Sequence, residues 1–276
     1  MAHKNLTEKI IETYFDENSF FTSVLNLFKQ QGEDVFIDHI SYRTFDFPHI
    51  NTDVLSVPLI EVGYREVERY KYENQNIKAR HYEHQTNKSA PLIYISELCV
   101  HHYSRFLYLQ LKEMVDNIPI EILCSNKILH TPQIWGTPSY DIYKRLKSES
   151  DYAAGVYVNG LTPHHLSVRV NSFKKYDTIK KVSEFLSQNQ ILSISKNQVS
   201  QDHNIPLIEQ IVISDNNVLI NFQEGNFDIP SKSLEFTKRN FSTNSSLFMG
   251  FIPNIDAKKV NPMTLEQINQ MLLEDI

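Results

Sequence analysis

The chain has 276 residues and a net charge of −6, with 41% hydrophobic and 22% charged residues. These proportions are ordinary for a globular protein, and the length suits one large domain or two fused modules. The acidic balance argues against general nucleic-acid binding, which needs a basic face, but it allows a local basic pocket for a small acid. The first 18 residues carry charges throughout. They predict neither a signal peptide nor a membrane span, so we expect a cytoplasmic protein.

The first half of the chain predicts two helices followed by a β-α-β-β-β order of elements. Residues 5–31 carry two apolar stripes at helical spacing, and Gly32 suits the end of the second helix. The elements expected next are a strand at 35–45, a helix at 48–62, strands at 64–72, 77–82 and 91–98, and a helix at 103–115. The run 91–98 has little polar face, which is typical of a central strand.

The second half repeats that order after an interruption. Pro132, the lone Trp135 and Gly136 mark a loop, and residues 140–154 predict one helix. The elements expected after it are a strand beyond Pro163, a helix at 174–188, strands at 207–213, 217–223 and 233–237, turns at Gly225, Pro230 and Ser231, and a closing helix at 265–273.

The two halves together predict an α+β fold built from duplicated β-α-β-β-β modules in a single domain. The shared sequence motif is only six residues long, and chance is the alternative, but the matching order of elements favours duplication. The expected segments are N-terminal helices at 1–34, a first module at 35–129, a helical insert at 130–158, a second module at 159–240 and a C-terminal segment at 241–276.

The two cysteines, Cys99 and Cys124, lie in apolar stretches of the sequence. Two cysteines cannot supply a disulfide framework or the four ligands of a zinc ribbon. We expect both to be buried thiols rather than a bridge or a nucleophile.

A six-residue motif, x-His-(Ile/Leu)-Ser-(Tyr/Val)-Arg, occurs twice and predicts two strands with similar polar faces. Side chains alternate between the two faces of a strand, so His39, Ser41 and Arg43 share one face. His165 and Arg169 share a face in the second copy. Each strand has an apolar face for a core and a polar face with one imidazole and one guanidinium. Two such strands resemble the halves of one site.

Two histidines on equivalent strands suggest metal ligands, because imidazole is a common ligand of Fe, Zn and Ni. A third ligand is needed, and Glu235 is the best candidate because its apolar neighbours face the other way. Two histidines and one carboxylate are typical of non-haem Fe(II) sites that react with dioxygen, although spacing alone allows Zn or Ni. His164 neighbours His165 but is expected on the opposite face. A packed histidine and a solvated Glu235 remain the structural alternatives.

Arg43 follows His39 on the same face at a distance of roughly 13 Å along the strand. Its planar guanidinium suits a carboxylate, which leaves room for a small acid between the metal and the arginine. Arg169 has the same geometry, so the sequence leaves open which arginine binds substrate, and a structural salt bridge is the alternative for either. Ser41 lies on the shared face, and Gln210 either faces the site or pairs across the sheet.

Several segments together resemble the 2-oxoadipate dioxygenase/decarboxylase family, also called hydroxyglutarate synthase. Each segment is a modest match, but they occur in family order across roughly residues 35–255. They are residues 38–45, 77–82, 92–98, 149–154, 159–160, 165–168 and 234–239.

The resemblance implies a vicinal-oxygen-chelate-like, partly closed sheet that holds one Fe(II). It implies His39, His165 and Glu235 as the ligands and Arg43 as the grip on a substrate carboxylate. It also implies a reaction in which 2-oxoadipate and O2 give 2-hydroxyglutarate and CO2. The chain departs from the family pattern at His164, where the family usually has Asn, and it is shorter than the bacterial enzymes.

Two other classes of function fit the same residues. A zinc or nickel lyase or isomerase of the glyoxalase type would keep the fold and the metal, and O2 dependence would distinguish it. A non-catalytic module that binds a small ligand would use the histidines as wall residues and would need no metal. The expected partners are a small 2-oxo acid and O2, without nucleic acid or membrane.

Overall fold

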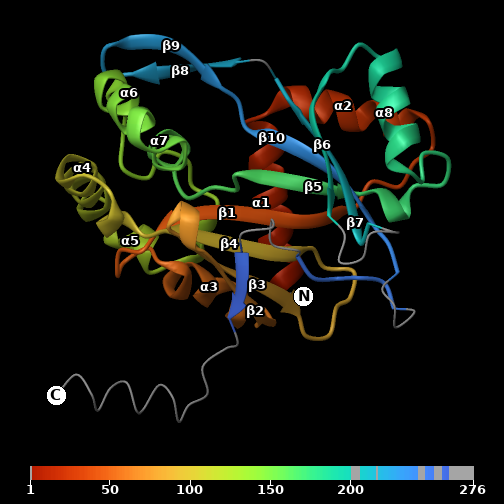
Figure 1. Cartoon of the computed structure of the whole chain (residues 1–276), viewed down its shortest axis with the longest axis horizontal. Coiled ribbons are helices and arrows are strands. Elements are labelled where there is room, and N and C mark those ends of the chain that lie inside the picture. Colours follow the sequence, from red (N-terminus) through yellow and green to blue (C-terminus); the bar gives the residue numbers. More distant parts are fainter. Residues whose placement is uncertain (1, 200–205, 216, 242–245, 252–256, 261–276) are drawn as a thin grey trace.

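The computed structural model describes residues 2–199, 206–215, 217–241, 246–251 and 257–260 (Figure 1). Its helices are α1 (Ala2–Asp16), α2 (Ser19–Gln30), α3 (Thr52–Glu61), α4 (Arg105–Asp116), α5 (Ile120–Leu123), α6 (Tyr140–Glu149), α7 (Asp151–Asn159) and α8 (Ile179–Gln188). Its strands are β1 (Ile37–Phe45), β2 (Tyr64–Tyr72), β3 (Ile77–His84), β4 (Leu92–Leu98), β5 (His165–Arg169), β6 (Ser193–Val199), β7 (Ile208–Ser214), β8 (Asn217–Phe222), β9 (Gly225–Pro230), β10 (Ser233–Arg239) and β11 (Ala257–Val260).

Nine strands form one sheet in the order β11-β2-β3-β4-β1-β5-β10-β7-β6. The two motif strands, β1 and β5, pair antiparallel at its centre. Each also pairs in parallel with the last strand of its own module, β1 with β4 and β5 with β10. The order β2-β3-β4-β1 therefore recurs in reverse as β5-β10-β7-β6, which relates the modules by an approximate twofold axis. The predicted α+β fold with duplicated β-α-β-β-β modules is confirmed.

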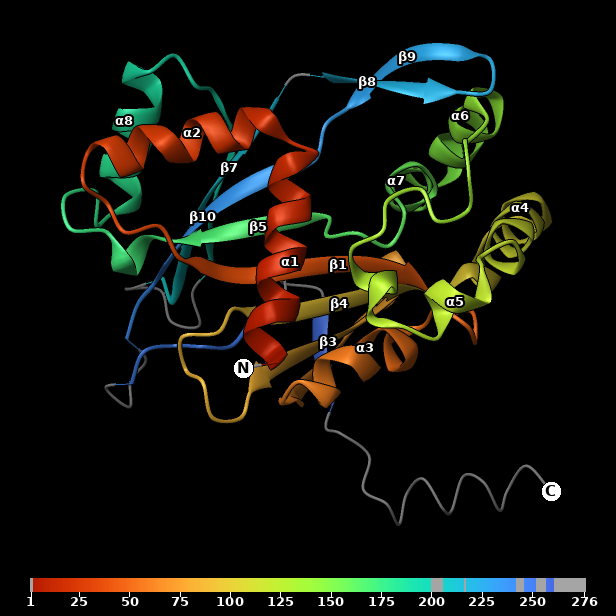
Figure 2. The ribbon, with the colours of Figure 1, turned by 180° about the vertical axis from the view of Figure 1, so that it is seen from behind.

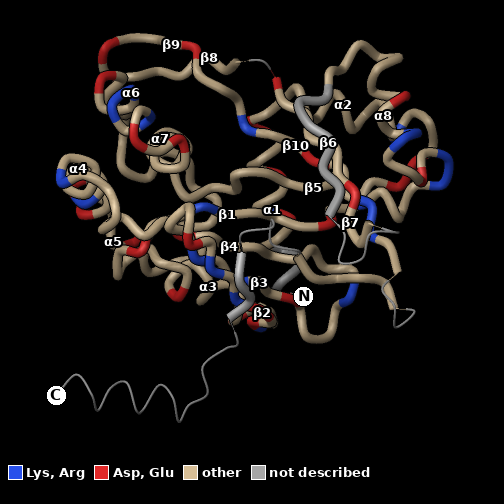
Figure 3. The backbone as a smooth tube through the Cα atoms, viewed as in Figure 1, with Lys and Arg blue, Asp and Glu red and all other residues tan. Residues whose placement is uncertain are grey.

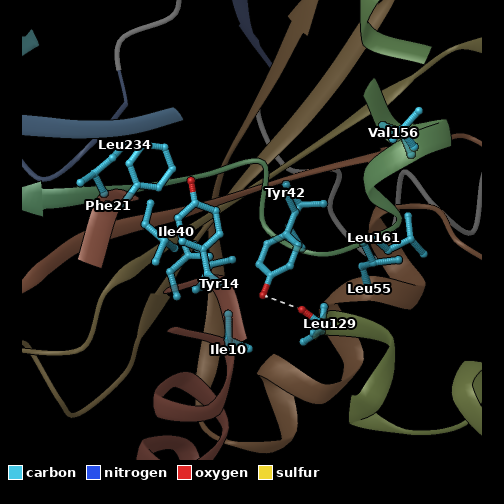
Figure 4. Close-up of a cluster of buried hydrophobic side chains, with 14 of the residues drawn as sticks. Ile10, Tyr14, Phe21, Ile40, Tyr42, Leu55, Leu129, Val156, Leu161 and Leu234 are labelled. Carbon is cyan, nitrogen blue, oxygen red and sulfur yellow. Dashed lines mark hydrogen bonds between the residues drawn. The ribbon is translucent and has the colours of Figure 1, made fainter. Parts of the chain in front are cut away.

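The main core lies on the face of the sheet that α1 and α2 cross (Figure 2). Ile40 and Tyr42 of β1 are fully buried there against Ile10 and Tyr14 of α1 (Figure 4). The Tyr42 hydroxyl also donates a hydrogen bond to the Leu129 carbonyl at 3.3 Å. Burial of each such side chain contributes about 1.5–3 kcal/mol, which fixes the apolar face of β1 inward. Alternation then commits the polar residues of β1 to the opposite face, where the site forms.

The helical insert differs from its prediction. The single helix expected over 140–154 is wrong, because the chain leaves the helix at Ser150 and begins again as α7. Ser150 has extended backbone angles, and its hydroxyl accepts a hydrogen bond from the Ala153 amide at 3.1 Å. Serine favours such a capping position over a helix interior. The break lets α7 approach β1, where the Tyr152 hydroxyl accepts a hydrogen bond from the Thr44 amide at 3.2 Å.

The second module also contains elements that the sequence did not reveal. Residues 217–223 form a strand as expected, but β8 pairs with β9 in a separate hairpin rather than in the main sheet. Glu224 in the turn holds this hairpin on α6, because its carboxylate accepts hydrogen bonds from the Ser139 hydroxyl and the Tyr140 amide. Strand β6 was not predicted.

The C-terminal segment contributes a further unpredicted strand. Strand β11 pairs antiparallel with β2 at the edge of the first module. The preceding residues 246–251 follow β10 of the second module, so the chain passes from one module to the other. The closing helix expected at 265–273 lies outside the described residues.

The two cysteines differ in burial, and the charged residues lie on several helices. Cys99 is buried as predicted, but Cys124 is exposed at the end of the short helix α5, so its predicted burial is wrong. Helices α4 and α8 each carry both basic and acidic residues (Figure 3). Among the described residues, no helix is long and apolar enough to cross a membrane.

Candidate metal centre and anion pocket

The three predicted ligands come together on three adjacent strands. His39 lies on β1, His165 on β5 and Glu235 on β10, on the face opposite the main core. The Glu235 carboxylate lies 3.4 Å from Nε2 of His39 and 3.5 Å from Nε2 of His165. Within the described ranges, these residues form the one group of three or more His, Cys, Asp or Glu side chains whose ligand atoms lie within 4.8 Å of one another. Their role as metal ligands remains a prediction.

His39 is held from behind by a buried ion pair. Its Nδ1 lies 2.9 Å from the Asp38 carboxylate, which in turn accepts two hydrogen bonds along one edge of the Arg239 guanidinium, at 2.9 and 2.8 Å. Asp38 and Arg239 are 0% and 2% exposed, so this pair is screened little by solvent. Burial lowers the pKa of His39, but the bond to Asp38 and the nearby Glu235 outweigh this and raise it. A proton on Nδ1 leaves the Nε2 lone pair facing Glu235 and His165.

His165 is held by its neighbour. Its Nδ1 lies 3.0 Å from Nδ1 of His164, which leaves Nε2 directed at Glu235. Burial is the largest influence on His165 and lowers its pKa to about 4, so the ring is neutral at pH 7. His164 precedes β5 and therefore does not follow the alternation expected of a strand residue. It lines a cavity with Arg43 rather than pointing to the opposite face.

Glu235 is oriented by the predicted residue Gln210. The Gln210 side-chain amide on β7 donates hydrogen bonds to the Glu235 carboxylate at 2.9 Å and to the Thr237 hydroxyl at 3.0 Å. Burial raises the pKa of Glu235, but the adjacent imidazoles of His165 and His39 outweigh it, and the net shift is downward. Glu235 is therefore an ionised carboxylate beside two imidazoles. Gln210 touches this carboxylate, and its predicted contact with substrate remains untested.

Arg43 is a half-buried cation that forms no ion pair with any described residue. Its guanidinium carbon lies 4.9 Å from the ring centre of Tyr152, whose hydroxyl is fixed by hydrogen bonds to the Ser96 carbonyl and the Thr44 amide. Burial lowers the pKa of Arg43. Arg43 also lines a cavity of about 270 Å³ together with His164 and Lys232. Asp151 also lines this cavity, but it forms no ion pair with Arg43, so the guanidinium is free to bind an incoming anion.

Arg169, the second predicted arginine, is already engaged. Its Nε lies 3.7 Å from the Asp38 carboxylate, and its Nη2 donates to the Ile37 carbonyl at 3.5 Å. Ser41 is buried and lies opposite His165 in the β1–β5 register, next to the triad. The structure thus gathers Ser41 and Arg43 beside the triad and places Arg169 against Asp38, and the substrate contacts of all three stay predictions.

Four residues around the site were not predicted: Asp38, Arg239, Tyr152 and Phe251. Asp38 and Arg239 fall within the motif segments, but no spacing shows that they meet across β1 and β10. Tyr152 reaches Arg43 only because the helix breaks at Ser150. The Phe251 ring centre lies 5.0 Å from the ring centre of His39. This contact joins residues far apart in the chain, and no sequence pattern predicts it.

The donor set fits a divalent transition metal. Two imidazole Nε2 atoms and one ionised carboxylate converge, while each histidine Nδ1 is occupied on the far side. Outer hydrogen bonds of this kind fix the ring orientation of metal-binding histidines. A set of two histidines and one carboxylate would leave further coordination positions open, and such sets bind Fe(II), with Zn or Ni also accepted.

Comparisons with known proteins point to one family. A model of the family described as 2-oxoadipate dioxygenase/decarboxylase matches residues 124–270, just over half of the chain. A chloroplastic 2-oxoadipate dioxygenase/decarboxylase of Arabidopsis thaliana is 25% identical over 242 residues. These residues cover 82% of this chain and 65% of the plant protein, so the chain spans less than two thirds of that relative.

Solved structures share the fold. A Shewanella frigidimarina protein described as a hydrolase superposes with a TM-score of 0.83 at 26% identity, covering 91% of this chain and 97% of its own. The hydroxyglutarate synthase of Oryza sativa, solved with 2-oxoadipate, gives 0.81 at 20% identity, covering 98% and 90%. A glyoxalase superfamily protein of Ralstonia eutropha gives 0.73 at 17% identity, covering 91% and 85%. The last two likenesses concern the fold alone, which is of the glyoxalase or vicinal-oxygen-chelate type.

Proposed function

Because the chain belongs to the 2-oxoadipate dioxygenase/decarboxylase family, we propose that it is a non-haem Fe(II) dioxygenase/decarboxylase acting on a 2-oxo dicarboxylic acid. The substrate resembles 2-oxoadipate, the acid found with the rice structure. One 2-oxoadipate and one O2 give one 2-hydroxyglutarate and one CO2, so carbon, hydrogen and oxygen balance without another reductant. Metal binding, the substrate and the use of O2 are all parts of this proposal.

The observation that carries the proposal is the triad together with Arg43, a half-buried cation without an ion-pair partner on the same strand as His39. His39, His165 and Glu235 hold the metal, and Arg43 binds the far carboxylate of the acid. Arg43 lies four strand steps beyond His39, roughly 13 Å between their Cα atoms. With both side chains turned inward, this spacing suits a short chain with an acidic group at each end.

The residues around the site each have a defined task. Tyr152 stacks on the Arg43 guanidinium and fixes its direction. Asp38 keeps a proton on Nδ1 of His39, and Gln210 holds the Glu235 carboxylate. A bound Fe(II) would supply the redox chemistry that lets O2 react with a 2-oxo acid. Holding both ends of the acid keeps the 2-oxo group at the metal and lowers the entropic cost of reaching the reactive geometry.

The test is O2 uptake by Fe(II)-reconstituted protein supplied with 2-oxoadipate. Assays with 2-oxoglutarate and without substrate are the controls. Uptake matched by equimolar CO2 would support the proposal. Protein that holds iron but consumes no O2 with either acid would contradict it, and turnover without O2 would instead favour a lyase or isomerase.

A further inference from the structure

Residues 246–251 form a strap that links the two modules across the site. Two carbonyl groups of the strap, from Phe248 and Gly250, accept hydrogen bonds from Nη1 of Arg239 at 3.3 and 2.7 Å. The Phe251 carbonyl accepts a hydrogen bond from the Tyr70 hydroxyl at 3.2 Å. Arg239 lies on β10 and Tyr70 on β2, so both modules hold the strap.

The strap places an aromatic ring against the proposed metal ligand. The Phe251 ring centre lies 5.0 Å from that of His39, 4.9 Å from that of His81 and 5.0 Å from that of Tyr94. The rings of Phe251 and His39 are nearly perpendicular, at 85°. This edge-to-face packing stabilises a fixed position of the imidazole.

Arg239 connects this strap to the other side of the same imidazole. Its Nε and Nη2 bind the Asp38 carboxylate, which holds Nδ1 of His39, while its Nη1 binds the strap. The guanidinium is rigid and planar, so both sets of hydrogen bonds fix one orientation. The His39 imidazole is thus held at Nδ1 by Asp38 and packed against the Phe251 ring of the strap, and Arg239 joins Asp38 to the strap.

We propose that Asp38 and Arg239 are positioning residues that couple occupation of the metal site to closure of the strap over His39. The inference rests on the metal site of the proposed function, but not on its substrate or reaction. A metal on Nε2 polarises the imidazole and strengthens the Nδ1 bond to Asp38. This favours the Arg239 orientation that holds the strap. By thermodynamic linkage, an anchored strap raises metal affinity by the same factor.

The first test is cobalt binding by the full chain, followed through the visible absorption of Co(II). Asp38→Asn replaces the acceptor with an amide that can donate to Nδ1 and so hold the wrong tautomer, with a proton on Nε2. We expect the Kd for Co(II) to rise by about 10- to 100-fold. Glu33→Gln is the matched control, because Glu33 is also a buried carboxylate and accepts hydrogen bonds from the amides of Lys174, Lys175 and Tyr176 rather than from a triad residue.

The second test is hydrogen exchange of the amides of residues 246–251 with and without Co(II). Cobalt should slow this exchange in the unsubstituted protein and in Glu33→Gln, but not in Asp38→Asn. Arg239→Lys keeps the positive charge beside Asp38 but cannot hold the carboxylate edge and the strap together. It should speed strap exchange by about 10-fold, with a smaller change in Kd.

The outcomes separate this inference from the proposed function. Equal Co(II) affinity in Asp38→Asn and the unsubstituted protein would overturn the positioning role and leave the metal centre standing. If Co(II) does not change the hydrogen-exchange rate of residues 246–251 in the unsubstituted protein, the coupling is overturned. Absence of any Co(II) binding by the unsubstituted protein would remove the metal centre, and the inference with it. If Asp38→Asn does not fold, Arg239→Lys with unchanged strap exchange would overturn the coupling by itself.

Discussion

Arg43 of the first module and Arg169 of the second occupy equivalent positions on β1 and β5, yet their surroundings differ. Arg43 lies against the Tyr152 ring and lines a cavity, and no described carboxylate pairs with it. Arg169 lies 3.7 Å from the Asp38 carboxylate. The difference arises because the helical insert supplies Tyr152 to one module, whereas the irregular start of β1 turns Asp38 toward the other. Equivalent residues on equivalent strands therefore have different contacts.

Glu235 and Tyr94 are a second pair of residues at equivalent positions with different surroundings. Glu235 lies beside Ser167 in the β5–β10 register, and Tyr94 lies beside Ser41 in the β1–β4 register. The approximate twofold axis therefore places Tyr94 where a fourth ligand would stand. Its hydroxyl instead pairs with the Tyr72 hydroxyl at 2.7 Å. The two modules thus place two pairs of equivalent residues at the site, His39 with His165 and Tyr94 with Glu235. Because the first module has a tyrosine where the second has a glutamate, it contributes no charged ligand at that position.

Removing the second module's carboxylate should have the largest effect. Glu235→Gln replaces an ionised ligand with a neutral amide, and His39→Ala removes a ligand outright. Both should weaken metal binding by more than about 100-fold, the upper end for outer hydrogen-bond partners, and abolish turnover. Metal content after gel filtration is the measurement. Full metal retention in either variant would contradict the triad.

Replacing Arg43 or Arg169 with methionine should have different effects on substrate binding and on stability. Arg43→Met should raise the KM for a 2-oxo dicarboxylate by about 10- to 100-fold, as expected for a lost charged hydrogen bond, and should affect a 2-oxo monocarboxylate less. Arg169→Met should lower stability while leaving both KM values nearly unchanged. Steady-state kinetics with the two acids measures this. Equal effects of Arg43→Met on both acids would argue against carboxylate binding.

The two histidines should also differ in their response to pH. The pKa of His39 is raised above 6.5, whereas that of His165 lies at about 4. Metal binding must displace a proton from His39 below its raised pKa but none from His165 near neutral pH. Affinity for Co(II) should therefore fall by about tenfold for each pH unit below the pKa of His39, with release of one proton. Release of two protons at neutral pH would show that the histidines are equivalent.

The smallest effect should come from the unused fourth position. Tyr94→Phe removes the hydrogen bond to Tyr72, so the free energy of unfolding should fall by about 1 kcal/mol. Metal affinity should stay unchanged, because this hydroxyl pairs with Tyr72 rather than with the triad. Urea unfolding and a Co(II) titration of the same variant measure both quantities. A weaker metal site would place Tyr94 among the groups that support the metal.

Local sequence patterns predicted the helices and strands in which apolar residues recur at a regular spacing. The alternation in β1 and β5 placed His39 and His165 on polar faces, because the intervening apolar residues must be buried. The insert and the C-terminal segment were predicted less well. The capping serine at Ser150 competes with a continuous helical pattern, and the pairing of β11 with β2 depends on residues almost two hundred positions apart.

The sequence by itself determined the duplicated modules, the two histidine strands and the candidate carboxylate, because strand alternation is a local property of the chain. Only the tertiary structure decided which arginine has an ion-pair partner, since that depends on Asp38 and Tyr152 arriving from different elements. It also decided that His164 supports His165 rather than facing away, and that Arg239 joins His39 to the strap. These are contacts between distant segments, and they follow from how the sheet packs rather than from any spacing along the chain.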